Sequence, residues 1–498
     1  MFEALIQGFL SLFVPANLLM VIAGVLIGIF LGVIPGLGAL IGISVILPMI
    51  FRIKDPGAGI LILVAIHSSV MTGGVIPAIL MGVPGAPTNL ATLTEGYPMT
   101  QRGEGARALG SALTSSALGG IIAVPFAILM LPLIIPIVLA MGTPEMTLMI
   151  LLGLSFLAIL GGGEGKIKSL MAGLFGILIS LIGLHDATGI YRYNFGSIYL
   201  ADGISMLTLI MGMFAIGEIF DLFLKGKATL ATGEAARVKT RDLFQGIIDV
   251  FRHWWLWFKS SVIGYIFGII PGIGGTTSIF VCYAHAKQIS KHPEQWGKGC
   301  IEGVIAPEAG NNSSVAGSVL TSLALGIPGD SALALILGAF LVFGITPGRE
   351  MLTCHLELTA MLLFSVALAN IMTAVICLPA ISTLAKVAIV PLKYLFSILL
   401  VFIMVSSFSA NREFMDMLII IPIGVIGLCM KRFGYSLPCF ILGFLLGRLF
   451  ENYLWLSLKI FGPLFFLSSP ITVIFIVILA ALFTVSPAKS FFRKRFRR

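Results

Sequence analysis

The chain has 498 residues, of which 58% are hydrophobic and 11% are charged, and its mean hydropathy is +1.08. These values exclude a water-soluble globular domain with a polar surface. Apolar runs of about twenty residues, long enough as helices to cross a hydrocarbon core of roughly 30 Å, recur from Leu18 to Thr484. We therefore predict an all-α polytopic membrane protein with roughly ten to twelve transmembrane helices.

The basic residues are distributed as in a membrane protein. The formal net charge is +9, and the basic residues lie in short loops between apolar runs and in the C-terminal sequence FFRKRFRR. The positive-inside rule then predicts that the C-terminus is cytoplasmic, and no nucleic acid is expected as a partner. The first residues, MFEALIQGFLSLF, lack the basic region of a signal peptide, so we expect no cleavage. The six cysteines show no CxxC spacing and are expected to be reduced packing residues.

Two distant segments carry the same motif. Gly28–Gly38 reads GIFLGVIPGLG and Gly264–Gly274 reads GYIFGIIPGIG, with six of eleven positions identical. Each motif interrupts an apolar run that is otherwise long enough to cross a bilayer. Two matched interruptions of this kind indicate a binding site rather than two unrelated kinks.

A second motif recurs in the same order. Gly82–Gly85 reads GVPG and Gly326–Gly329 reads GIPG, and upstream Ser69 aligns with Ser313. The first motif repeats at an offset of 236 residues and the second at an offset of 244, so the second half carries eight extra residues between them. We expect the polar loop His285–Glu308 to hold these residues.

This order of motifs divides the chain into two halves. We predict a first transmembrane repeat at residues 1–224 and a cytoplasmic linker at 225–259 with an interfacial amphipathic segment rich in tryptophan. A second repeat is predicted at 260–498, with extra C-terminal spans and a basic tail. Repeats with interrupted helices are typical of secondary transporters, whose binding site lies where the repeats meet.

The charge pattern favours an inverted relation between the repeats. The second glycine-proline motif follows the basic linker, whereas the first follows a segment without lysine or arginine, so the spans before them are predicted to start on opposite sides. The loops after the motifs do not differ in this way, since Arg52 and Lys54 follow the first motif and Lys287 and Lys291 follow the second.

The glycine-proline motifs predict breaks in the helices at Pro35 and Pro271. Proline removes a backbone donor, and the flanking glycines permit positive φ. A helix that restarts after the break aims its N-terminal amides at the interruption, where an anion fits. One helix terminus stabilises a negative charge by roughly 0.3–2 kcal/mol, whereas a lysine or arginine at the membrane centre costs about 2.5–3.5 kcal/mol. The alternative is that these motifs only pack helices closely and kink them.

Amide and hydroxyl side chains lie beside each break. They suit carboxylate oxygens or a small cation, although serine and threonine on membrane helices also bond to their own backbone or hold helices together. No catalytic residue and no metal ligand is predicted. The predicted substrate-binding residues are Pro35, Gly36, Gly38, Pro84, Gly85, Thr88, Asn89, Pro271, Gly272, Gly274, Asn311, Asn312, Ser313, Ser314, Pro328, Gly329 and Ser331.

Ionisable residues within apolar segments are costly unless they are paired or functional. Asp330, which follows Pro328-Gly329, could coordinate a coupling sodium ion or carry a proton, or it could be a helix N-cap. His67 aligns with Asn311 and is either part of the site or a packing residue. Glu302 and Glu308 lie in or near a polar loop and are expected to be solvated.

Several motifs in order resemble those of one transporter family. PGLG, then GGVIPAILMGVPGAP with EGYPM, and later PGIGG, APEAGNN and LGIPG with GITPG are similar to the large membrane permease (TctA) of the tripartite tricarboxylate transporters. The resemblance extends over about residues 20–350. It implies that the blocks around Pro35, Gly82–Asn89, Pro271 and Asn311–Ser331 line a transport path.

The same resemblance implies partners and a compartment. It suggests a multi-pass protein of a bacterial inner membrane that works with a small four-span membrane subunit and a periplasmic solute-binding protein. The substrate is then citrate or another di- or tricarboxylate, and a sodium or proton gradient drives uptake. No cofactor other than the coupling ion is expected.

Two other classes of function are weighed against this one. An intramembrane enzyme is disfavoured because the chain has no HExxH, GxSxG or P-loop motif. An anion channel, or a carrier for other organic anions, is the alternative. No filter sequence supports a channel, and polar pockets beside interrupted helices fit a carrier better.

Overall fold

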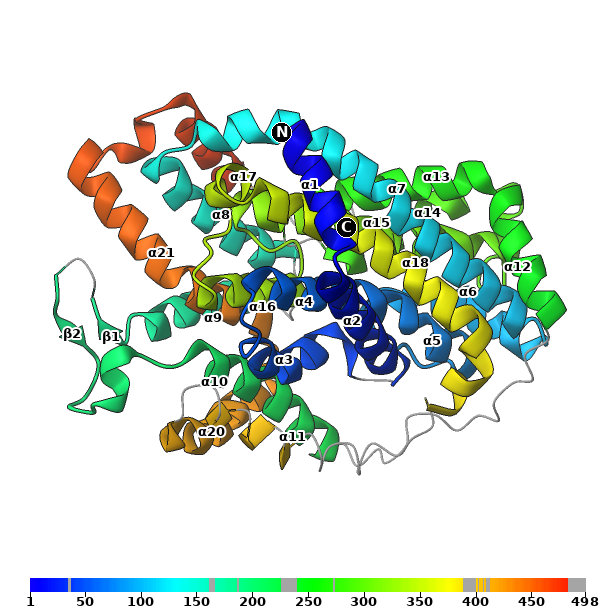
Figure 1. Cartoon of the computed structure of the whole chain (residues 1–498), viewed down its shortest axis with the longest axis horizontal. Helices are drawn as coiled ribbons and strands as arrows, with labels where there is room; N and C mark the ends of the chain where they lie inside the picture. The colour runs from blue at the N-terminus through cyan, green and yellow to red at the C-terminus, as the bar shows by residue number, and fades with distance from the viewer. Residues whose placement is uncertain are drawn as a thin grey trace, which may run out of the picture.

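The computed structural model of the chain is a bundle of helices with one short two-stranded hairpin at one end of its long axis (Figure 1). The residues that the structure describes are 1–34, 37–160, 166–185, 188–224, 240–271, 274–387, 400–401, 403–405, 407–408 and 413–481. The α-helices are α1 (Phe2–Leu12), α2 (Pro15–Val33), α3 (Gly38–Ile50), α4 (Pro56–Gly73), α5 (Val75–Met81), α6 (Leu90–Gln101), α7 (Gly105–Leu139), α8 (Thr143–Leu160), α9 (Lys166–Ser180), α10 (Met206–Ile210), α11 (Gly217–Leu224), α12 (Thr240–Arg252), α13 (Trp254–Ile269), α14 (Gly274–Ile289), α15 (Glu302–Leu325), α16 (Ser331–Val342), α17 (Arg349–Thr353), α18 (Leu356–Val387), α20 (Phe414–Arg432) and α21 (Leu437–Phe461). The other elements are the 3₁₀ helices η1 (Pro87–Asn89), η2 (Tyr199–Asp202), η4 (Pro293–Gln295) and η5 (Phe465–Leu467), the π-helix η3 (Met211–Ile216), and strands β1 (Gly183–Leu184) and β2 (Tyr191–Arg192).

The apolar helices confirm an all-α membrane fold. In the described part of the chain, six helical segments are long and apolar enough to cross a membrane, and six further apolar helices have 10 to 17 residues. The long segments are Pro15–Val33, Pro56–Met81, Gly105–Leu139, Leu356–Val387, Phe414–Arg432 and Leu437–Phe461. The exact number of crossings stays a prediction. Of the cysteines, Cys282, Cys377 and Cys439 are buried, as predicted for packing residues, whereas Cys354 and Cys429 are exposed.

The first glycine-proline motif lies between two helices that form a hairpin. Helix α2 ends at Val33, and α3 begins at Gly38. Helices α2 and α4 run in the same direction, because Gly24 faces Ile62 while Gly32, further along α2, faces Val70, further along α4. The helix between them, α3, therefore runs back. Glycine is required for this contact, since a β-carbon on Gly32 would lie 2.7 Å from the Val70 carbonyl oxygen.

The second glycine-proline motif has the same arrangement. Helix α13 ends at Ile269, and α14 begins at Gly274. Gly264 faces Gly310, and Gly268 faces Ser314, so α13 and α15 are parallel and α14 runs back between them. The predicted interruption of the helices at both motifs is confirmed in the form of two hairpins.

The motifs GVPG and GIPG also share their local geometry. Gly82 follows the last residue of α5 with φ 69° and ψ 21°, and Gly326 follows α15 with φ 68° and ψ 16°. Both glycines are in the left-handed region, where they end the preceding helix without the steric penalty of a side chain.

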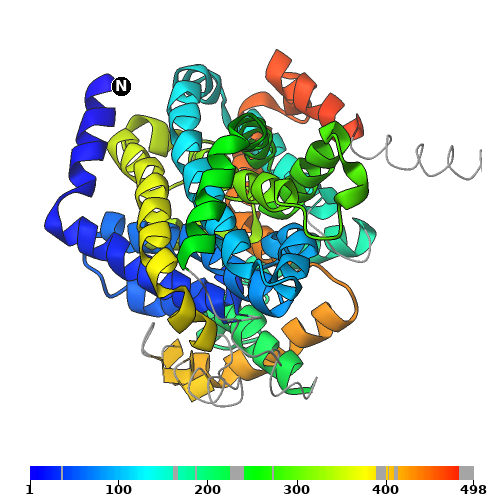
Figure 2. The same ribbon diagram turned by 90° about the vertical axis from the view of Figure 1, so that its right-hand side faces the viewer.

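Reciprocal contacts join the two halves. Helix α1 packs against α18, and helix α12 packs against α7; Figure 2 shows α1 on the outside of the bundle beside α18. A β-carbon on Gly8 would lie 2.5 Å from the Glu357 carbonyl oxygen, and one on Gly246 would meet the Arg107 carbonyl oxygen. Helix α1 of the first half thus covers a long helix of the second, and α12, which lies in the segment predicted as the linker, covers a long helix of the first.

The helices that follow the hairpins form the centre of the molecule. All residues of α15 from Gly303 to Ala324 are buried, as are all residues of α4 from Ala58 to Gly73. Both helices are rich in small residues, which permit close helix approach in a membrane. Side chains of α4 and α15 therefore define the interior that the two halves share.

Candidate functional site

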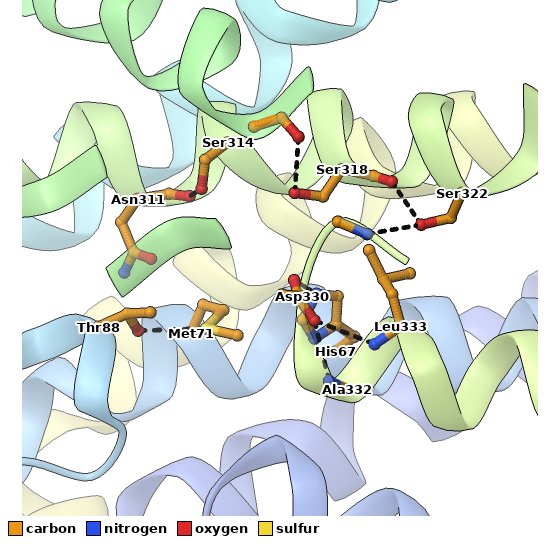
Figure 3. Close-up of polar contacts among 12 residues, drawn as sticks. His67, Met71, Thr88, Asn311, Ser314, Ser318, Ser322, Asp330, Ala332 and Leu333 are labelled. Carbon is orange, nitrogen blue, oxygen red and sulfur yellow. Dashed lines mark hydrogen bonds and ion pairs between the residues drawn. The ribbon is translucent and has the colours of Figure 1, made fainter. Parts of the chain in front are cut away.

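The two halves meet where the start of α14 contacts η1. A β-carbon on Gly275 of α14 would lie 3.2 Å from the Thr88 Cγ2 atom of η1, 3.1 Å from Ser314 Oγ and 3.6 Å from Asn311 Oδ1. Thr88 also contacts α4, where its hydroxyl lies 3.2 Å from the Met71 sulfur. In Figure 3 the Asn311 side chain extends toward the side on which Thr88 and Met71 lie. Residues that are predicted separately in the two halves of the sequence are therefore neighbours.

The end of α2 and the start of α3 lie beside the GVPG motif. The Gly85 amide donates to the Gly74 carbonyl oxygen at 3.1 Å. A β-carbon on Gly85 would meet the Gly32 carbonyl oxygen, and one on Gly38 would lie 4.0 Å from the Gly85 oxygen. Residues 85–88 thus link the start of α3 to the start of α14. Helices bind anions through their N-terminal amides, so the two starts bring matched anion-binding groups to one segment.

Glu308 corrects one sequence expectation. The polar loop is only residues 290–301, because α15 begins at Glu302, and Glu308 lies within α15 and is fully buried. Glu302 is partly exposed, with a side-chain exposure of 27%. The Glu308 carboxylate accepts a hydrogen bond from Thr92 at 2.6 Å and one from Asn89 at 3.5 Å. The sequence around Glu308 is polar because it lines the shared interior and not because it faces water.

A second group of side chains connects four helices, α4, α7, α15 and α18, next to Glu308. Asn312 donates to the Thr72 hydroxyl at 2.6 Å and to the Asn370 side-chain oxygen. The Thr72 hydroxyl lies 3.4 Å from that of Ser116. Asn370 belongs to α18, in a region whose sequence predicts only apolar spans. An asparagine within such a span is the signal that could have identified it.

Many polar atoms in this interior have no hydrogen-bond partner within the described part of the chain. Buried, unpartnered polar atoms are rare, and each calls for an explanation such as an unbound ligand or ion. The central ones are Asn89 Oδ1, Glu308 Oε2, Asn311 Oδ1 and Nδ2, Asn312 Oδ1, Ser68 Oγ and His67 Nδ1.

Asp330 connects the halves and caps a helix. Its Oδ1 accepts the amides of Ala332 and Leu333 at 2.9 and 3.0 Å, which confirms the predicted N-cap of α16. Its Oδ2 lies 3.1 Å from Nε2 of His67 on α4 (Figure 3). The structure thus brings His67 to Asp330, and the role of Asp330 in ion coupling stays a prediction.

The GIPG segment lies on the other end of α15. The Gly329 amide donates to the Ser322 hydroxyl at 3.1 Å, and a β-carbon on Gly329 would meet Ser318. Pro328 is buried beside Gly329, and Ser331 begins α16. In this segment, Asp330 makes the side-chain contact with α4, through His67.

Two of the predicted hydroxyls bond to their own helix. Ser313 donates to the Gly310 carbonyl oxygen at 3.2 Å, and Ser314 donates to the Asn311 carbonyl oxygen at 2.6 Å. Gly274 is the first residue of α14, and Pro271 and Pro84 lie in the turns beside the contacts described above. Pro35, Gly36 and Gly272 lie outside the described residues, and substrate binding by any residue of this set stays a prediction.

Glu95, in the EGYPM motif, is a residue that sequence reasoning did not assign. It is fully buried, and its carboxylate accepts the backbone amides of Gly297, Gly299 and Cys300 at 2.5, 2.8 and 2.9 Å. The Tyr283 hydroxyl donates to the same carboxylate at 2.7 Å. A residue of the first half thus holds the loop between α14 and α15 of the second half.

A basic cavity of about 780 Å³ lies on the other side of this loop. Its lining residues come from the start of α13, the end of α14 and the connection between α6 and α7. Gly299 and Cys300 of the loop also line it. The charged side chains around it are Arg102, Arg107, Lys259, Lys291, Glu104 and Glu302, with His253 and His292. Two of its features match the sequence expectation for a cytoplasmic face, namely the excess of basic side chains and the nearby exposed Trp254 and Trp255.

Helix α6 connects the interior to this cavity. Thr92 contacts Glu308, Glu95 holds the loop, and Met99 lines the cavity. These residues are three and four positions apart, so they follow one face of the helix. From Thr92 to Arg102 the helix rises by about 15 Å.

Comparison with known proteins identifies related sequences. An uncharacterised 52.8 kDa protein in the TAR-I ttuC′ 3′ region of Agrobacterium vitis is 32% identical over 447 residues, which cover 90% of this chain and 88% of that relative. An uncharacterised protein in the TAR-II ttuC′ 3′ region of the same organism is 35% identical over 191 residues, which cover 38% of this chain and 79% of that relative. No solved structure matches the chain significantly.

A family model described as the tripartite tricarboxylate transporter TctA family matches residues 18–442. The match includes both glycine-proline motifs, both helical hairpins and the central helices α4 and α15. Most of the chain is covered, and the apolar helices agree with a membrane transporter. The chain therefore belongs to the tripartite tricarboxylate transporter TctA family and is a membrane component of tricarboxylate transport.

Proposed function

We propose that the chain is the large permease subunit of a binding-protein-dependent secondary transporter. In this proposal it imports di- or tricarboxylates such as citrate across a bacterial inner membrane, in symport with sodium ions or protons. A periplasmic solute-binding protein delivers the substrate, and a small membrane subunit completes the transporter. The C-terminus and the linker at 225–259 are cytoplasmic.

The observation that carries the proposal is that the starts of α3 and α14 both lie against residues 85–88. Gly38 lies next to Gly85, and Gly275 lies next to Thr88, so the starts of α3 and α14 converge on a four-residue segment. A carboxylate bound there is stabilised by backbone amides and by neutral side chains such as Asn311. An anion site of this kind avoids the cost of burying a lysine or arginine in the membrane.

The cavity beside the Glu95-held loop is the proposed cytoplasmic exit. Its basic side chains attract an anion that leaves the interior, and α6 extends from the interior to the cavity. For release, the loop at 290–301 moves away from Glu95. Such a step fits alternating access, in which one side of the site opens while the other is closed.

The test is uptake of labelled acids into proteoliposomes that contain the chain, its small membrane subunit and its binding protein. Citrate, tartrate, malate and an aromatic acid are compared under an imposed sodium or proton gradient. We expect gradient-driven accumulation of at least one carboxylate above its external concentration. Accumulation of none of these acids under either gradient would overturn the proposal.

The same assay separates a carrier from the channel alternative. A carrier saturates with substrate because each transport cycle needs one occupied site, whereas channel flux stays proportional to concentration over the same range. The variant Thr88→Val keeps the size of the side chain and removes its hydroxyl at the proposed site. We expect this variant to raise the substrate concentration at half-maximal uptake, and Thr353→Val, on the exposed end of α17, to leave it unchanged.

A further inference from the structure

Glu308 is a fully buried carboxylate with no charged partner in the described part of the chain. The side chains that face it are Thr92, Asn89, Ser116 and Asn311, all of them neutral. A buried charge without a partner is strongly unfavourable, so such a carboxylate either takes up a proton or binds a cation. The arrangement of the amides around it distinguishes these two cases.

The orientation of two of these asparagines is determined by their hydrogen bonds. Asn370 Nδ2 donates to the Val366 carbonyl oxygen, so Asn370 Oδ1 is the acceptor for Asn312 Nδ2. Asn89 Nδ2 likewise donates to the Met71 carbonyl oxygen at 3.0 Å. The remaining side-chain atom of both Asn312 and Asn89 is therefore an oxygen, and both oxygens are buried without a donor among the described residues.

Together these groups form a set of buried oxygen acceptors. Asn89 Oδ1, Asn312 Oδ1 and Glu308 Oε2 have no donor among the described residues, and neither polar atom of the Asn311 side chain has a partner there. A proton on Glu308 would neutralise the carboxylate and supply a single O–H donor, which still leaves at least one of the two amide oxygens without a donor. A hard cation accepts carboxylate and carbonyl oxygens as ligands at the same time. One carboxylate balances the charge of a monovalent cation.

Asp330 is less suited to hold an ion. Its Oδ1 accepts two backbone amides and its Oδ2 lies at 3.1 Å from His67. An ion bound there would compete with the cap of α16 and with the contact to α4. The Oε2 atom of Glu308, by contrast, has no hydrogen-bond partner among the residues that the structure describes.

We propose that Glu308 binds a sodium ion together with side-chain oxygens of Asn311 and Asn312. The inference rests on the function proposed above and makes this sodium the coupling ion. These three residues belong to α15 of the second half, and Glu308 accepts a hydrogen bond from Asn89 of the first half at 3.5 Å. The ion therefore lies where the halves meet, and Asn311 lies next to Gly275 and Thr88, where the carboxylate is proposed to bind.

The sodium site also explains why the acid and the ion move together. A cation beside Asn311 neutralises Glu308, and the substrate anion is then bound without repulsion from an unpaired carboxylate close by. Binding of either one favours the other, so the two affinities are coupled by the same factor.

The experiment measures binding of ²²Na⁺ to the full-length chain in nanodiscs together with its small membrane subunit. Wild type and three variants are compared: Glu308→Gln, Asn311→Leu and the control Glu302→Gln, a partly exposed glutamate on the same helix. We expect Glu308→Gln to weaken sodium binding by roughly 100-fold or more and Glu302→Gln to leave it unchanged. Sodium binding to Glu308→Gln with wild-type affinity, or no sodium binding to wild type, would overturn the inference.

Asn311→Leu keeps the inference testable if Glu308→Gln does not fold. Neither polar atom of the Asn311 side chain has a partner among the described residues, so a structural role predicts unchanged or higher stability after this substitution. A ligand role predicts weaker sodium binding in the same folded protein, and unchanged sodium binding contradicts it. Carboxylate uptake is measured in parallel. Uptake by a wild-type chain that binds no sodium refutes the ion site alone, whereas sodium binding that depends on Glu308 without uptake of any acid refutes only the proposed function.

Discussion

Two acidic side chains in the interior have different surroundings: Glu308 is fully buried, and Asp330 is 18% exposed. Asp330 accepts two helix amides and lies next to His67, whereas Glu308 faces only neutral groups and keeps one oxygen unpartnered among the described residues. An acid whose acceptors are all engaged is suited to a structural role. An acid with a free oxygen beside other free oxygens is suited to binding an ion.

Substitution of Asp330 separates its cap from its contact with His67. Asparagine is as good an N-cap as aspartate, so Asp330→Asn keeps the cap and loses only the charge opposite His67. Asp330→Ala loses both, and we expect it to lower the free energy of unfolding by about 1 kcal/mol more than Asp330→Asn. Denaturation of both variants in detergent, followed by circular dichroism, measures the difference.

The uptake assay decides whether Asp330 also couples. With the ion at Glu308, Asp330→Asn retains its dependence on the sodium gradient. If the variant transports the acid without any gradient dependence, the coupling ion is bound at Asp330 instead.

The sequence alone identified some of these residues and not others. Asn311, Thr88 and Asp330 were predicted because they lie beside matched motifs. Glu308 was predicted as solvated, which is wrong, because a polar stretch on a helix and a polar stretch in a loop look alike when only neighbours in the chain are considered. Asn370 was not predicted, since its contact with Asn312 depends on how α18 packs against α15.

At the scale of elements, glycines set the distance between paired helices. Gly28 and Gly268 lie on the first helix of each hairpin, α2 and α13, and both face backbone atoms of the next parallel helix. A β-carbon on Gly28 would lie 2.7 Å from the Ile66 carbonyl oxygen, and one on Gly268 would meet the Ser314 carbonyl oxygen. Backbone cannot move aside as a flexible side chain can, so α2 and α13 would be displaced.

Alanine at either glycine is therefore expected to destabilise the protein. We predict that Gly28→Ala and Gly268→Ala each lower the free energy of unfolding by about 1–3 kcal/mol, through overpacking. Gly173 in α9 is a matched control, because its β-carbon would find its nearest neighbours at 3.5 Å, an ordinary contact. Gly173→Ala is expected to be neutral or to stabilise by up to ~1 kcal/mol. Equal melting temperatures for all three variants would contradict this explanation of the motifs.

The Glu95 contact predicts a measurable change in the reactivity of Cys300. Burial raises the pKa of the Cys300 thiol above its ordinary value, which lowers the thiolate fraction at neutral pH. In Glu95→Gln the amide group cannot accept all three backbone amides, and the loop opens. The pKa then falls toward its ordinary value, and alkylation of Cys300 at pH 7 becomes faster.

Mass spectrometry of the peptide that contains Cys300 follows this alkylation with time. Glu104→Gln is the control, because Glu104 is partly exposed beside the same cavity but does not contact the loop amides. A rate that is unchanged in Glu95→Gln would show that the loop is held by other contacts.

The positions of the helix breaks could be predicted from the sequence, but the distant residues that contact the adjoining segments could not. Proline and glycine act locally, so the ends of α2, α5, α13 and α15 follow from residues within a few positions. The contact between Glu95 and the loop at 297–300 joins residues far apart in the chain. Nothing in the spacing of EGYPM indicates that a carboxylate there accepts amides from the other half.

At the scale of the whole molecule, the contacts between the halves are reciprocal. Helix α1 covers α18 and α12 covers α7, and both covering helices carry exposed aromatic side chains, Phe2 and Phe9 on α1 and Phe244 and Phe251 on α12. Exposed aromatics on short amphipathic helices are typical of the membrane interface. Inverted halves would place α1 and α12 at opposite interfaces.

Cysteine labelling tests this inversion. In a background without native cysteines, Lys54→Cys reports the loop after the first hairpin and Lys291→Cys the loop after the second. The inverted arrangement predicts that an impermeant maleimide added to intact cells labels position 54 and not position 291, which reacts only after the cells are opened. Labelling of both positions from one side would show that the halves are parallel.

The central claim is that one anion site is built from both halves where α3 and α14 begin. The most direct measurement is an experimental structure of the full-length chain, with its membrane subunit, bound to the carboxylate that it accumulates. We predict density for the acid between residues 85–89 and the start of α14, in contact with both halves. Density that touches only one half, or that lies on a lipid-facing surface away from Thr88 and Gly275, would contradict the account.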